Sequence, residues 1–362
     1  MEPHDLRSIA TAFEFQGEAS AFTPFGNGHI NDTYLITCQT SHAPVRYTLQ
    51  RINRQVFRSP AAVMQNIERV TAHLAAQLAG APDRDRRALT LVRARDGRSW
   101  HEDAAGEIWR VYRFIENARS FETATSVDQA FQAAQAFGRF QQQLASLPPP
   151  RLNETIPDFH HTPKRFAALE QAIASDVKGR AALAKPEIDF ALAHKSIAGV
   201  LLQANLPERI THNDTKFNNL LLDDATGESL CVIDLDTVMP GLALYDFGDM
   251  VRTTTSPAAE DEQDLCKVTM QFPLFEALVR GYVSTAGQFL TKAEKKLLAF
   301  SGKLITFETG IRFLVDYLHG DTYFKILRED HNLDRCRTQF KLVESIEELE
   351  ERMNGLVEKI AD

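Results

Sequence analysis

The first 163 residues of this 362-residue chain contain no lysine, and arginine carries all of their positive charge up to Lys164. Cysteine is scarce too. The four cysteines lie far apart without a C-x-x-C pair, which excludes a disulfide framework or zinc knuckle, and we expect buried free thiols. No run approaches the roughly 18 to 20 apolar residues of a membrane span. The first residues also lack the basic-then-apolar order of a signal peptide, so we expect a cytoplasmic protein.

Positive charge is in short supply overall, with 40 basic against 49 acidic residues and a formal charge of −9. This balance disfavours nucleic acid or an anionic membrane as the main partner and favours a small molecule. The deficit is uneven. Residues 1–117 contain 14 basic and 13 acidic side chains, whereas residues 118–362 contain 26 and 36. The two parts of the chain therefore differ in net charge. The sequence leaves the oligomeric state open.

Residues 1–117 are predicted to form a small lobe of strands with one helix between them. The helix begins after Ser59, with Pro60 at the favoured first helical position, and ends at Gly80. Runs of β-branched, aromatic and leucine residues predict the strands. These strands are expected at 33–36, 46–52, 89–92 and 108–115.

Residues 118–362 are predicted to form a larger, mainly helical lobe, which gives an α+β chain of two lobes. A short island of strand character, 219–222 and 230–233, interrupts the helices and is joined by a turn-rich segment. Apolar residues at helical spacing predict the other elements. Helices are expected at 126–147, 162–177, 186–204, 273–287, 291–319 and 337–361.

The strongest chemical signal is the pattern H-x-D-x-x-x-x-N, formed by His212, Asp214 and Asn219. This is the spacing of the catalytic loop in kinases. If the hairpin that follows turns between residues 226 and 227, Asn219 and Asp234 face each other at its mouth. Amide and carboxylate oxygens at one point suit magnesium bridging nucleotide phosphates.

Phosphoryl transfer requires that an attacking hydroxyl be positioned and that charge on the transferred group be neutralised. Asp214 is expected to accept the acceptor's proton, and Lys216 to place a cation near the γ-phosphate. His212 is expected to brace the loop through hydrogen bonds. Lys216 and Asp236 remain open to a plainer interpretation, as an exposed lysine and a structural carboxylate. A literal D-F-G begins at Asp246, which we expect to hold the catalytic loop or to cap a following helix.

Further patterns connect these residues to a family. H-N-D-x-x-x-x-N, I-D-x-D and Y-D-x-G-D together resemble the aminoglycoside phosphotransferase and choline kinase superfamily, which implies a bilobal, protein-kinase-like fold. Four segments, 25–33, 49–53, 234–241 and 310–324, are similar to the N-acetylhexosamine 1-kinases. That resemblance implies phosphorylation of the anomeric hydroxyl of N-acetylglucosamine or N-acetylgalactosamine, with ATP and Mg²⁺.

The resemblance also implies roles for particular residues. Asp214 would be the base, with Asn219 and Asp234 as metal ligands. The nucleotide site would comprise a covering loop, a hinge facing adenine and an acidic partner for the third strand: Gly26, Asn27 and Gly28; Phe114, Ile115 and Glu116; and Glu68. The sugar site would combine Asp214 with His29, Arg312 and Tyr323.

The missing lysine is a departure from this family. Kinases use a lysine on the third strand to hold the α- and β-phosphates, but here Gln50 occupies that position and Arg51 follows it. Either the glutamine makes neutral hydrogen bonds to phosphate, or a bulge lets Arg51 supply the charge. In both cases the all-arginine small lobe is expected to face the phosphates.

Three other functions remain open. A kinase for another small alcohol is the first, such as an aminoglycoside, a choline-like amine or a homoserine-like acceptor, because an acidic lobe is compatible with cations. The second is a nucleotide-binding pseudokinase without turnover, which only the missing lysine favours. The third is a metal-dependent hydrolase.

Overall fold

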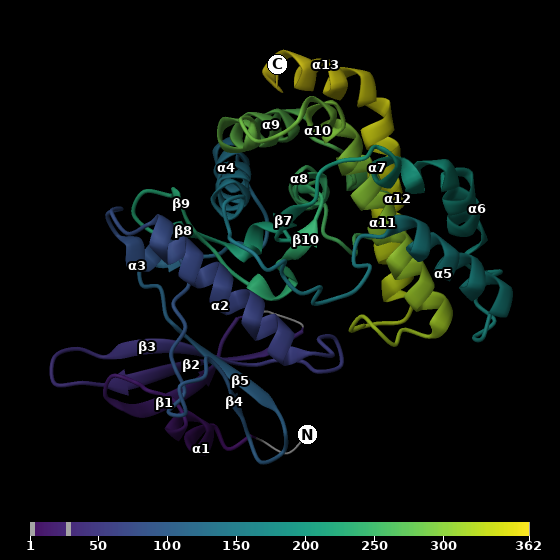
Figure 1. Cartoon of the computed structure of the whole chain (residues 1–362). Coiled ribbons are helices and arrows are strands. Elements are labelled where there is room, and N and C mark those ends of the chain that lie inside the picture. The colour runs from purple at the N-terminus through teal and green to yellow at the C-terminus, as the bar shows by residue number, and fades with distance from the viewer. Residues whose placement is uncertain (1–3, 27–29, 362) are drawn as a thin grey trace.

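A small β-rich lobe and a larger helical lobe make up the chain in this computed structural model, which describes residues 4–26 and 30–361 (Figure 1). The small lobe contains a five-stranded antiparallel sheet in the order β1-β2-β3-β5-β4. Its strands are β1 (Glu18–Pro24), β2 (Asp32–Gln39), β3 (Val45–Arg51), β4 (His101–Glu102) and β5 (Ile108–Arg113). The helices of this region are α1 (Leu6–Thr11), α2 (Pro60–Gln77) and α3 (Arg84–Arg87).

Helix α2 lies between the small sheet and the large lobe (Figure 1). Pro60 stands at its first position as expected, although the Ser59 side chain makes no capping hydrogen bond. Its buried apolar residues share one core with Phe140 and Leu235 of the large lobe. The two lobes are therefore joined by a continuous apolar contact through α2. The region between the small sheet and the catalytic loop, where Arg110 of β5 meets Asp236, is called the cleft.

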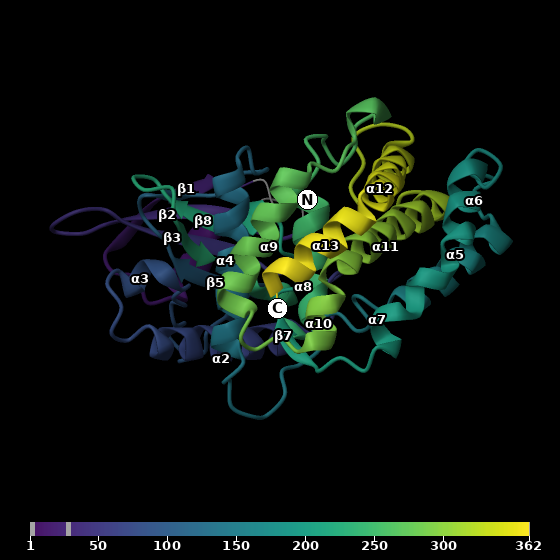
Figure 2. The same ribbon diagram turned by 90° about the horizontal axis from the view of Figure 1, so that it is seen from above.

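The large lobe is built around α11, which is buried along most of its length and packs against α5, α8 and α12 (Figure 2). Helices α4 and α9 form a second packed pair. The helices are α4 (Val127–Leu144), α5 (Thr162–Ser175), α6 (Lys185–Ala193), α7 (Val200–Gln203), α8 (Ala243–Thr254), α9 (Phe272–Ala286), α10 (Lys292–Lys296), α11 (Leu298–His319), α12 (His331–Glu348) and α13 (Glu350–Ala361). No described helix is long and apolar enough to cross a membrane.

Short strands and 3₁₀ turns line the large-lobe side of the cleft. The strands are β6 (Ala118–Arg119), β7 (Arg209–Thr211), β8 (Leu220–Asp223), β9 (Ser229–Val232) and β10 (Met239–Gly241). The turns η2 (Phe217–Asn219) and η3 (Leu235–Thr237) lie between these strands. Two more turns of the large lobe, η1 (Lys195–Gly199) and η4 (Leu265–Lys267), lie outside this segment. The two-lobed α+β architecture is confirmed, whereas a domain boundary after residue 117 stays a prediction.

Several predicted elements were wrong in detail. Residues 89–92 form no strand and make only a single bridge, between Leu91 and Tyr112. Three long predicted helices are divided: 186–204 into α6, η1 and α7, 291–319 at Leu297, and 337–361 at Leu349. Helix α8 was missed. It is buried on nearly all sides, yet Asp246, Asp249 and Arg252 recur at helical spacing, so the sequence contained a helical period that the prediction did not use. Of the four cysteines expected to be buried, Cys266 is exposed.

The hairpin β8–β9 has a different register from the expected one. Leu220 pairs with Val232 and Leu221 with Cys231, but Leu222 pairs with Ser229, so one residue bulges between them. The turn therefore does not centre between residues 226 and 227. The Asn219 carbonyl instead accepts a hydrogen bond from the Ile233 amide, at 2.9 Å. Asp234 follows this partner by one residue, so the predicted facing of Asn219 and Asp234 was wrong.

Candidate active site

The loop between β7 and β8 carries His212 and Asp214, and Asp246 of α8 holds this loop. The Asp246 carboxylate accepts hydrogen bonds from the amides of His212, at 2.9 Å, and Asn213, at 2.7 Å. The Gln141 side chain donates to it at 2.6 Å. Burial raises the pKa of Asp246, although these donors and His212 oppose the shift. Asp246 thus holds the loop, as expected, and it caps no helix because it lies inside α8.

His212 connects the loop to the end of β9. Its Nε2 lies 2.9 Å from the Ile233 carbonyl oxygen, and its ring meets Phe137 and Phe140 edge to face. Thr237 donates its hydroxyl to the His212 carbonyl at 2.7 Å. These contacts match the expected bracing role, since both ends of the residue are tied to the segment that contains Asp234.

Asp214 meets two of the other predicted site residues. The Asn219 amide donates to its Oδ2 at 3.0 Å, and Lys216 Nζ lies 3.1 Å from its Oδ1. Burial raises the pKa of Asp214, but the charges of Lys216 and His212 and the hydrogen bond from Lys216 bring the net shift below the usual value. The same pairing raises the pKa of Lys216. Asp214 is therefore an ionised acceptor held beside a cation.

Asp234 provides the second carboxylate of the cleft. Its backbone is left-handed, with φ of 58°, and its side chain makes no capping hydrogen bond to the turn η3 that follows. The residue is exposed to solvent, but desolvation by the surrounding protein atoms and repulsion from Asp236 and Asp214 raise the pKa of Asp234 to about 6. This exposed carboxylate is short of positive charge, a deficit that a cation would relieve.

We tested whether this site suits magnesium. Asn219 donates its amide group to the Asp214 backbone oxygen and carboxylate, which leaves its side-chain oxygen as the atom to coordinate a cation. Together with Asp234, this makes two hard oxygen donors. Among the described residues, no group of three or more His, Cys, Asp or Glu is arranged to hold a metal. The donor set fits Mg²⁺, which usually keeps several water or phosphate ligands and needs few from the protein.

The third strand does not turn a cation toward the cleft. Gln50 donates to the Thr33 hydroxyl at 3.1 Å. Arg51 instead forms ion pairs with Asp32 and Glu107, the latter at 3.0 Å. No bulge occurs between β3 and its neighbours, so Arg51 keeps the opposite face of the strand. The expectation that a bulge lets Arg51 supply the charge was wrong.

Glu68 does not reach the third strand either. It lies on α2 and pairs with Arg93 at 2.8 Å. The Arg93 side chain is 56% exposed, so this ion pair lies at the surface and away from Gln50. The expected role of Glu68 was therefore wrong, because α2 turns that residue outward while burying Asn66 against the large lobe.

Arg110 of β5 is a cation that the sequence reasoning missed. It lies directly across the sheet from Gln50 and is only 1% exposed. Its guanidinium pairs with Asp236 of the large lobe. The residue sits in a strand that reads as an ordinary apolar run, so the only available signal was the arginine interrupting Trp109 and Val111.

The expected hinge is partly occupied by protein contacts. Glu116 pairs with Arg46, and Arg86 donates to the carbonyls of Glu116, at 3.1 Å, and Asn117, at 2.9 Å. Within the described residues, the Phe114 carbonyl, both backbone groups of Ile115 and the Glu116 amide take no hydrogen bond, so these groups are left to meet a base. Phe114 packs against Phe25, with ring centroids 5.6 Å apart.

The covering loop is only partly described. Gly26 begins it with φ of 79°, a conformation that glycine adopts without strain. Asn27, Gly28 and His29 lie outside the described residues. Their predicted roles stay predictions.

A second polar group lies on the other side of the catalytic loop. His160 Nδ1 is 2.7 Å from Glu308 of α11, and its Nε2 is 3.2 Å from the Asn213 carbonyl oxygen. Thr162 donates to the same glutamate at 2.6 Å. Burial raises the pKa of Glu308, but His160 and the two hydrogen bonds bring it below its usual value. This connection from α11 to the residue before Asp214 was also missed from sequence.

A cavity of about 290 Å³ opens beside this group, between α5 and α11. It contains Arg312 and Tyr323, two of the residues assigned to the sugar site, and Arg165. Arg312 lies one helical turn after Glu308 and packs over the rings of Phe159 and Phe324. The other lining residues are Ala168, Ile311, Val315, Asp316, His319, Thr322 and Phe324.

The charge of this cavity, which we call the α11 pocket, is positive. Burial, with repulsion from Arg312, lowers the pKa of Arg165. No ion pair engages Arg165 or Arg312 among the described residues. The carboxylate of Asp316 accepts hydrogen bonds from the amides of residues 322–324 and from Asn332, so its oxygens already have donors and are not free to bind the ammonium group of a ligand.

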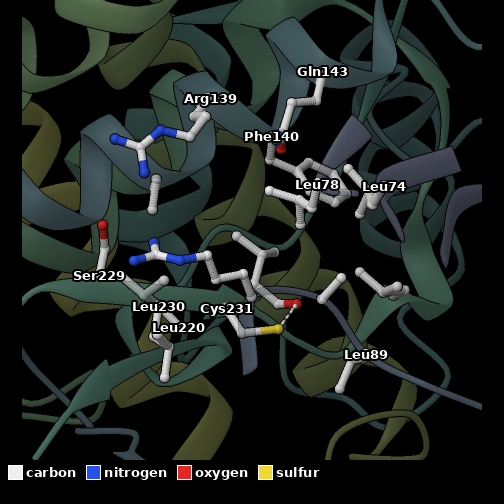
Figure 3. A pocket seen from close by; sticks show the side chains of 15 residues that line it. Leu74, Leu78, Leu89, Arg139, Phe140, Gln143, Leu220, Ser229, Leu230 and Cys231 are labelled. Atoms are coloured by element: carbon white, nitrogen blue, oxygen red, sulfur yellow. Dashed lines mark hydrogen bonds between the residues drawn. The ribbon is translucent and has the colours of Figure 1, made fainter. Parts of the chain in front are cut away.

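Another cavity, of about 60 Å³, lies behind the β8–β9 hairpin (Figure 3). Its walls are mainly apolar, with Leu74 and Leu78 of α2 facing Leu220 of the hairpin, and Arg139 stands at one side (Figure 3). This volume holds only a few water molecules. It is therefore a packing gap behind the hairpin and too small for a nucleotide or a sugar.

Comparison with known proteins agrees with this geometry. A profile described as the phosphotransferase enzyme family matches residues 21–269. An aminoglycoside phosphotransferase from Alicyclobacillus acidocaldarius is 12% identical, with a TM-score of 0.63 over 99% of this chain and 98% of that one. A microcompartment-associated aminopropanol kinase is 20% identical, with a TM-score of 0.56 over 96% and 98% of the two chains.

An ADP-bound aminoglycoside phosphotransferase is 12% identical, with a TM-score of 0.51 over 91% of this chain and 95% of that one. At these identities the likeness shows a shared fold. The expected protein-kinase-like fold is thereby confirmed.

Proposed function

The chain belongs to the phosphotransferase enzyme family, and we propose that it is an ATP-dependent kinase that phosphorylates the anomeric hydroxyl of an N-acetylhexosamine. The observation that carries the choice of acceptor is the α11 pocket. Its volume of about 290 Å³ is at the lower end for small-molecule sites and suits one sugar ring better than a multi-ring antibiotic.

Charge also separates the candidate acceptors. Arg165 and Arg312 line the α11 pocket, and the Asp316 carboxylate is already hydrogen-bonded. This combination repels an aminoglycoside or a choline-like amine. The guanidinium groups and the Tyr323 hydroxyl suit sugar hydroxyls and an acetamido carbonyl. The acidity of the large lobe as a whole therefore does not favour cationic acceptors, because the pocket itself is basic.

The reaction would proceed at the cleft side of the catalytic loop. The Asp214 carboxylate accepts the proton of the anomeric hydroxyl while the sugar oxygen attacks the γ-phosphorus. The bond between that phosphorus and the β,γ-bridging oxygen breaks, and ADP leaves. Magnesium, when bound, neutralises phosphate charge, and Asn219 and Asp234 would hold it. Lys216 keeps Asp214 ionised and stands where it can approach the transferred group.

Nucleotide binding is proposed for the cleft between the lobes. The Ile115 backbone and the loop that begins at Gly26 are the parts expected to contact ATP. A structural neighbour was solved with ADP bound, which supports this choice of nucleotide. The paired carboxyl and amide oxygens of Asp234 and Asn219 argue against a pseudokinase.

The experiment is an ADP-release assay with magnesium, ATP and single acceptors. The panel contains N-acetylglucosamine, N-acetylgalactosamine, kanamycin, choline and homoserine. We expect release above the blank with one or both N-acetylhexosamines, and ³¹P NMR of the product should show a sugar 1-phosphate. Turnover only with a cationic acceptor would contradict the sugar assignment, and turnover with none would favour the pseudokinase.

A variant pair connects the activity to the α11 pocket. Arg312→Gln should raise KM for the sugar about tenfold or more, with KM for ATP nearly unchanged, because it removes hydrogen bonds to the acceptor alone. The matched control is Arg280→Gln, since Arg280 on α9 pairs only with a neighbouring glutamate at the surface. Equal effects of the two substitutions would remove Arg312 from the acceptor site.

A further inference from the structure

A row of hydrogen-bonded polar side chains crosses the small sheet toward the cleft. Thr33, Gln50 and Arg110 are register partners on β2, β3 and β5. Gln50 donates to Thr33 at 3.1 Å, and Arg110 Nε donates to the Gln50 side-chain oxygen at 3.0 Å. The strand position where kinases have lysine is therefore connected directly to an arginine on the neighbouring strand.

The row ends on the large lobe. The Arg110 guanidinium pairs with Asp236, and these residues are 1% and 2% exposed. Asn31 donates to the other oxygen of the Asp236 carboxylate at 2.7 Å. A buried ion pair is retained only where its remaining donors and acceptors are satisfied. Here both oxygens of the carboxylate have partners, and both partners come from the small lobe.

Asp236 stands two residues after Asp234, within the turn η3. The left-handed backbone of Asp234 is costly for a residue other than glycine, so something must hold the turn. Asp214 and Asp236 both repel the negative charge of Asp234 at this point. The guanidinium of Arg110, paired with Asp236, places a positive charge beside this group of carboxylates.

We propose that Arg110 takes over the task of the absent third-strand lysine, as a positioning residue that acts through Asp236. It fixes a positive charge beside the predicted metal ligand and joins the two lobes across the nucleotide site. The charge has moved one strand along the sheet, from β3 to β5, with Gln50 bridging the gap. This proposal rests on the nucleotide site of the proposed function, but not on the identity of the acceptor.

The first test is the affinity for ADP with magnesium, measured by titration calorimetry. Arg110→Gln should weaken ADP binding about 10- to 100-fold, the range for a lost charge-assisted contact. In kinetics, KM for ATP should rise while KM for the acceptor changes little. Arg110→Lys should recover part of the loss, because a lysine keeps the charge but cannot bond Gln50 and Asp236 together.

The sharper test moves the charge back to the third strand. In the double variant Gln50→Lys/Arg110→Gln, the positive charge stands on β3 and the glutamine on β5, at positions that face each other. We expect this variant to recover at least a third of the ADP affinity lost in Arg110→Gln. Gln50→Lys alone should not tighten binding, since it adds a second buried cation beside Arg110.

Arg209→Gln is the structural control. Arg209 pairs with the buried Glu294 at 3.0 Å inside the large lobe, so its loss also leaves a buried carboxylate without its partner. It should lower Tm, and ADP affinity should stay within about twofold of wild type, because the pair is remote from the row. If Arg110→Gln does not fold, Arg110→Lys and the charge-exchange variant still decide the question.

The outcomes separate this proposal from the proposed function. ADP binding by wild type together with unchanged binding by Arg110→Gln would overturn the role of Arg110 and leave the kinase intact. The same conclusion would follow if the charge-exchange variant folded and bound no better than Arg110→Gln. Absence of ADP binding in the wild type would overturn both.

Discussion

The two sides of the cleft differ in how their charged residues are paired. In the small sheet an arginine can be paired within its own lobe, as Arg51 is with Asp32 and Glu107. Residues 223–249 of the large lobe contain seven acids and no basic residue. Three of these acids, Asp223, Asp224 and Asp236, are paired with arginines from residues 86–119.

Because of this pairing, neither the net charge of the small lobe nor the number of acids in residues 223–249 shows how many charges are free to bind a ligand. The small sheet does not present a field of free arginines to the phosphates, because Arg46, Arg51 and Arg110 on its strands all have carboxylate partners. The acidic segment does not present seven carboxylates to a metal either. Asp249 pairs with Arg252, and Asp246 is buried as the residue that holds the loop. Of the remaining two acids, Glu228 and Asp234, neither forms an ion pair among the described residues, and it is Asp234 whose charge is repelled by Asp214. Net charge by region therefore located the cleft, but not the residues that act in it.

The largest expected effect separates two aspartates of the large lobe, the half-buried Asp214 and the buried Asp246. Asp214→Asn should lower kcat about 10³-fold or more, because the amide cannot accept the hydroxyl proton. Affinity for ADP should stay near that of wild type, measured by calorimetry. Retained turnover would mean that another group is the base and that Asp214, like Asp246, has only a structural role.

Asp246→Asn is the matched substitution at the aspartate that holds the loop. It should lower the free energy of unfolding by about 2–4 kcal/mol, because the amide cannot accept both backbone hydrogen bonds and the one from Gln141. Urea unfolding measures this, with Asp214→Asn as the comparison. If Asp246→Asn is as stable as wild type, its carboxylate does not hold the loop.

A smaller effect is expected on the small-lobe side. Arg51→Gln should change KM for ATP by less than about twofold, because Asp32 and Glu107 already engage that arginine on the far face of β3. Steady-state kinetics beside Arg110→Gln makes the contrast. A large rise in KM for Arg51→Gln would restore the prediction that Arg51 meets the phosphates.

The smallest effect concerns one of the contacts that join the two sides. The backbone amide of Thr226, with Arg86 and the Ala225 amide, lowers the pKa of Asp223 to about 2. A carboxyl whose pKa is lowered by folding stabilises the protein above its unfolded pKa near 4, and the contribution is lost as pH falls toward 2. Asp223→Asn should therefore lower Tm at pH 7, and the two proteins should converge between pH 4 and 2. A constant difference in Tm over that range would contradict this cause.

The sequence by itself determined the class of this protein. The spacing of His212, Asp214 and Asn219 is local, and a loop of that length can bring those side chains together wherever it is placed. Strand periodicity and the start of α2 at Pro60 are likewise local, so two lobes with a kinase-like loop were predictable. Helix α8 was missed although Asp246, Asp249 and Arg252 recur at helical spacing, so it too was predictable from local sequence.

Only the tertiary structure brought Arg110 to Asp236 and formed the α11 pocket. Arg51 and Arg110 look alike as residues in strands, but the pairing of β3 with β5 turns one outward and the other toward Asp236. The α11 pocket is likewise lined by residues of α5 and of the segment 311–324. Arg165 and Arg312 meet there although they lie far apart in the chain. Such contacts depend on strand register and helix packing, which act between segments distant in sequence and leave no mark on either segment alone.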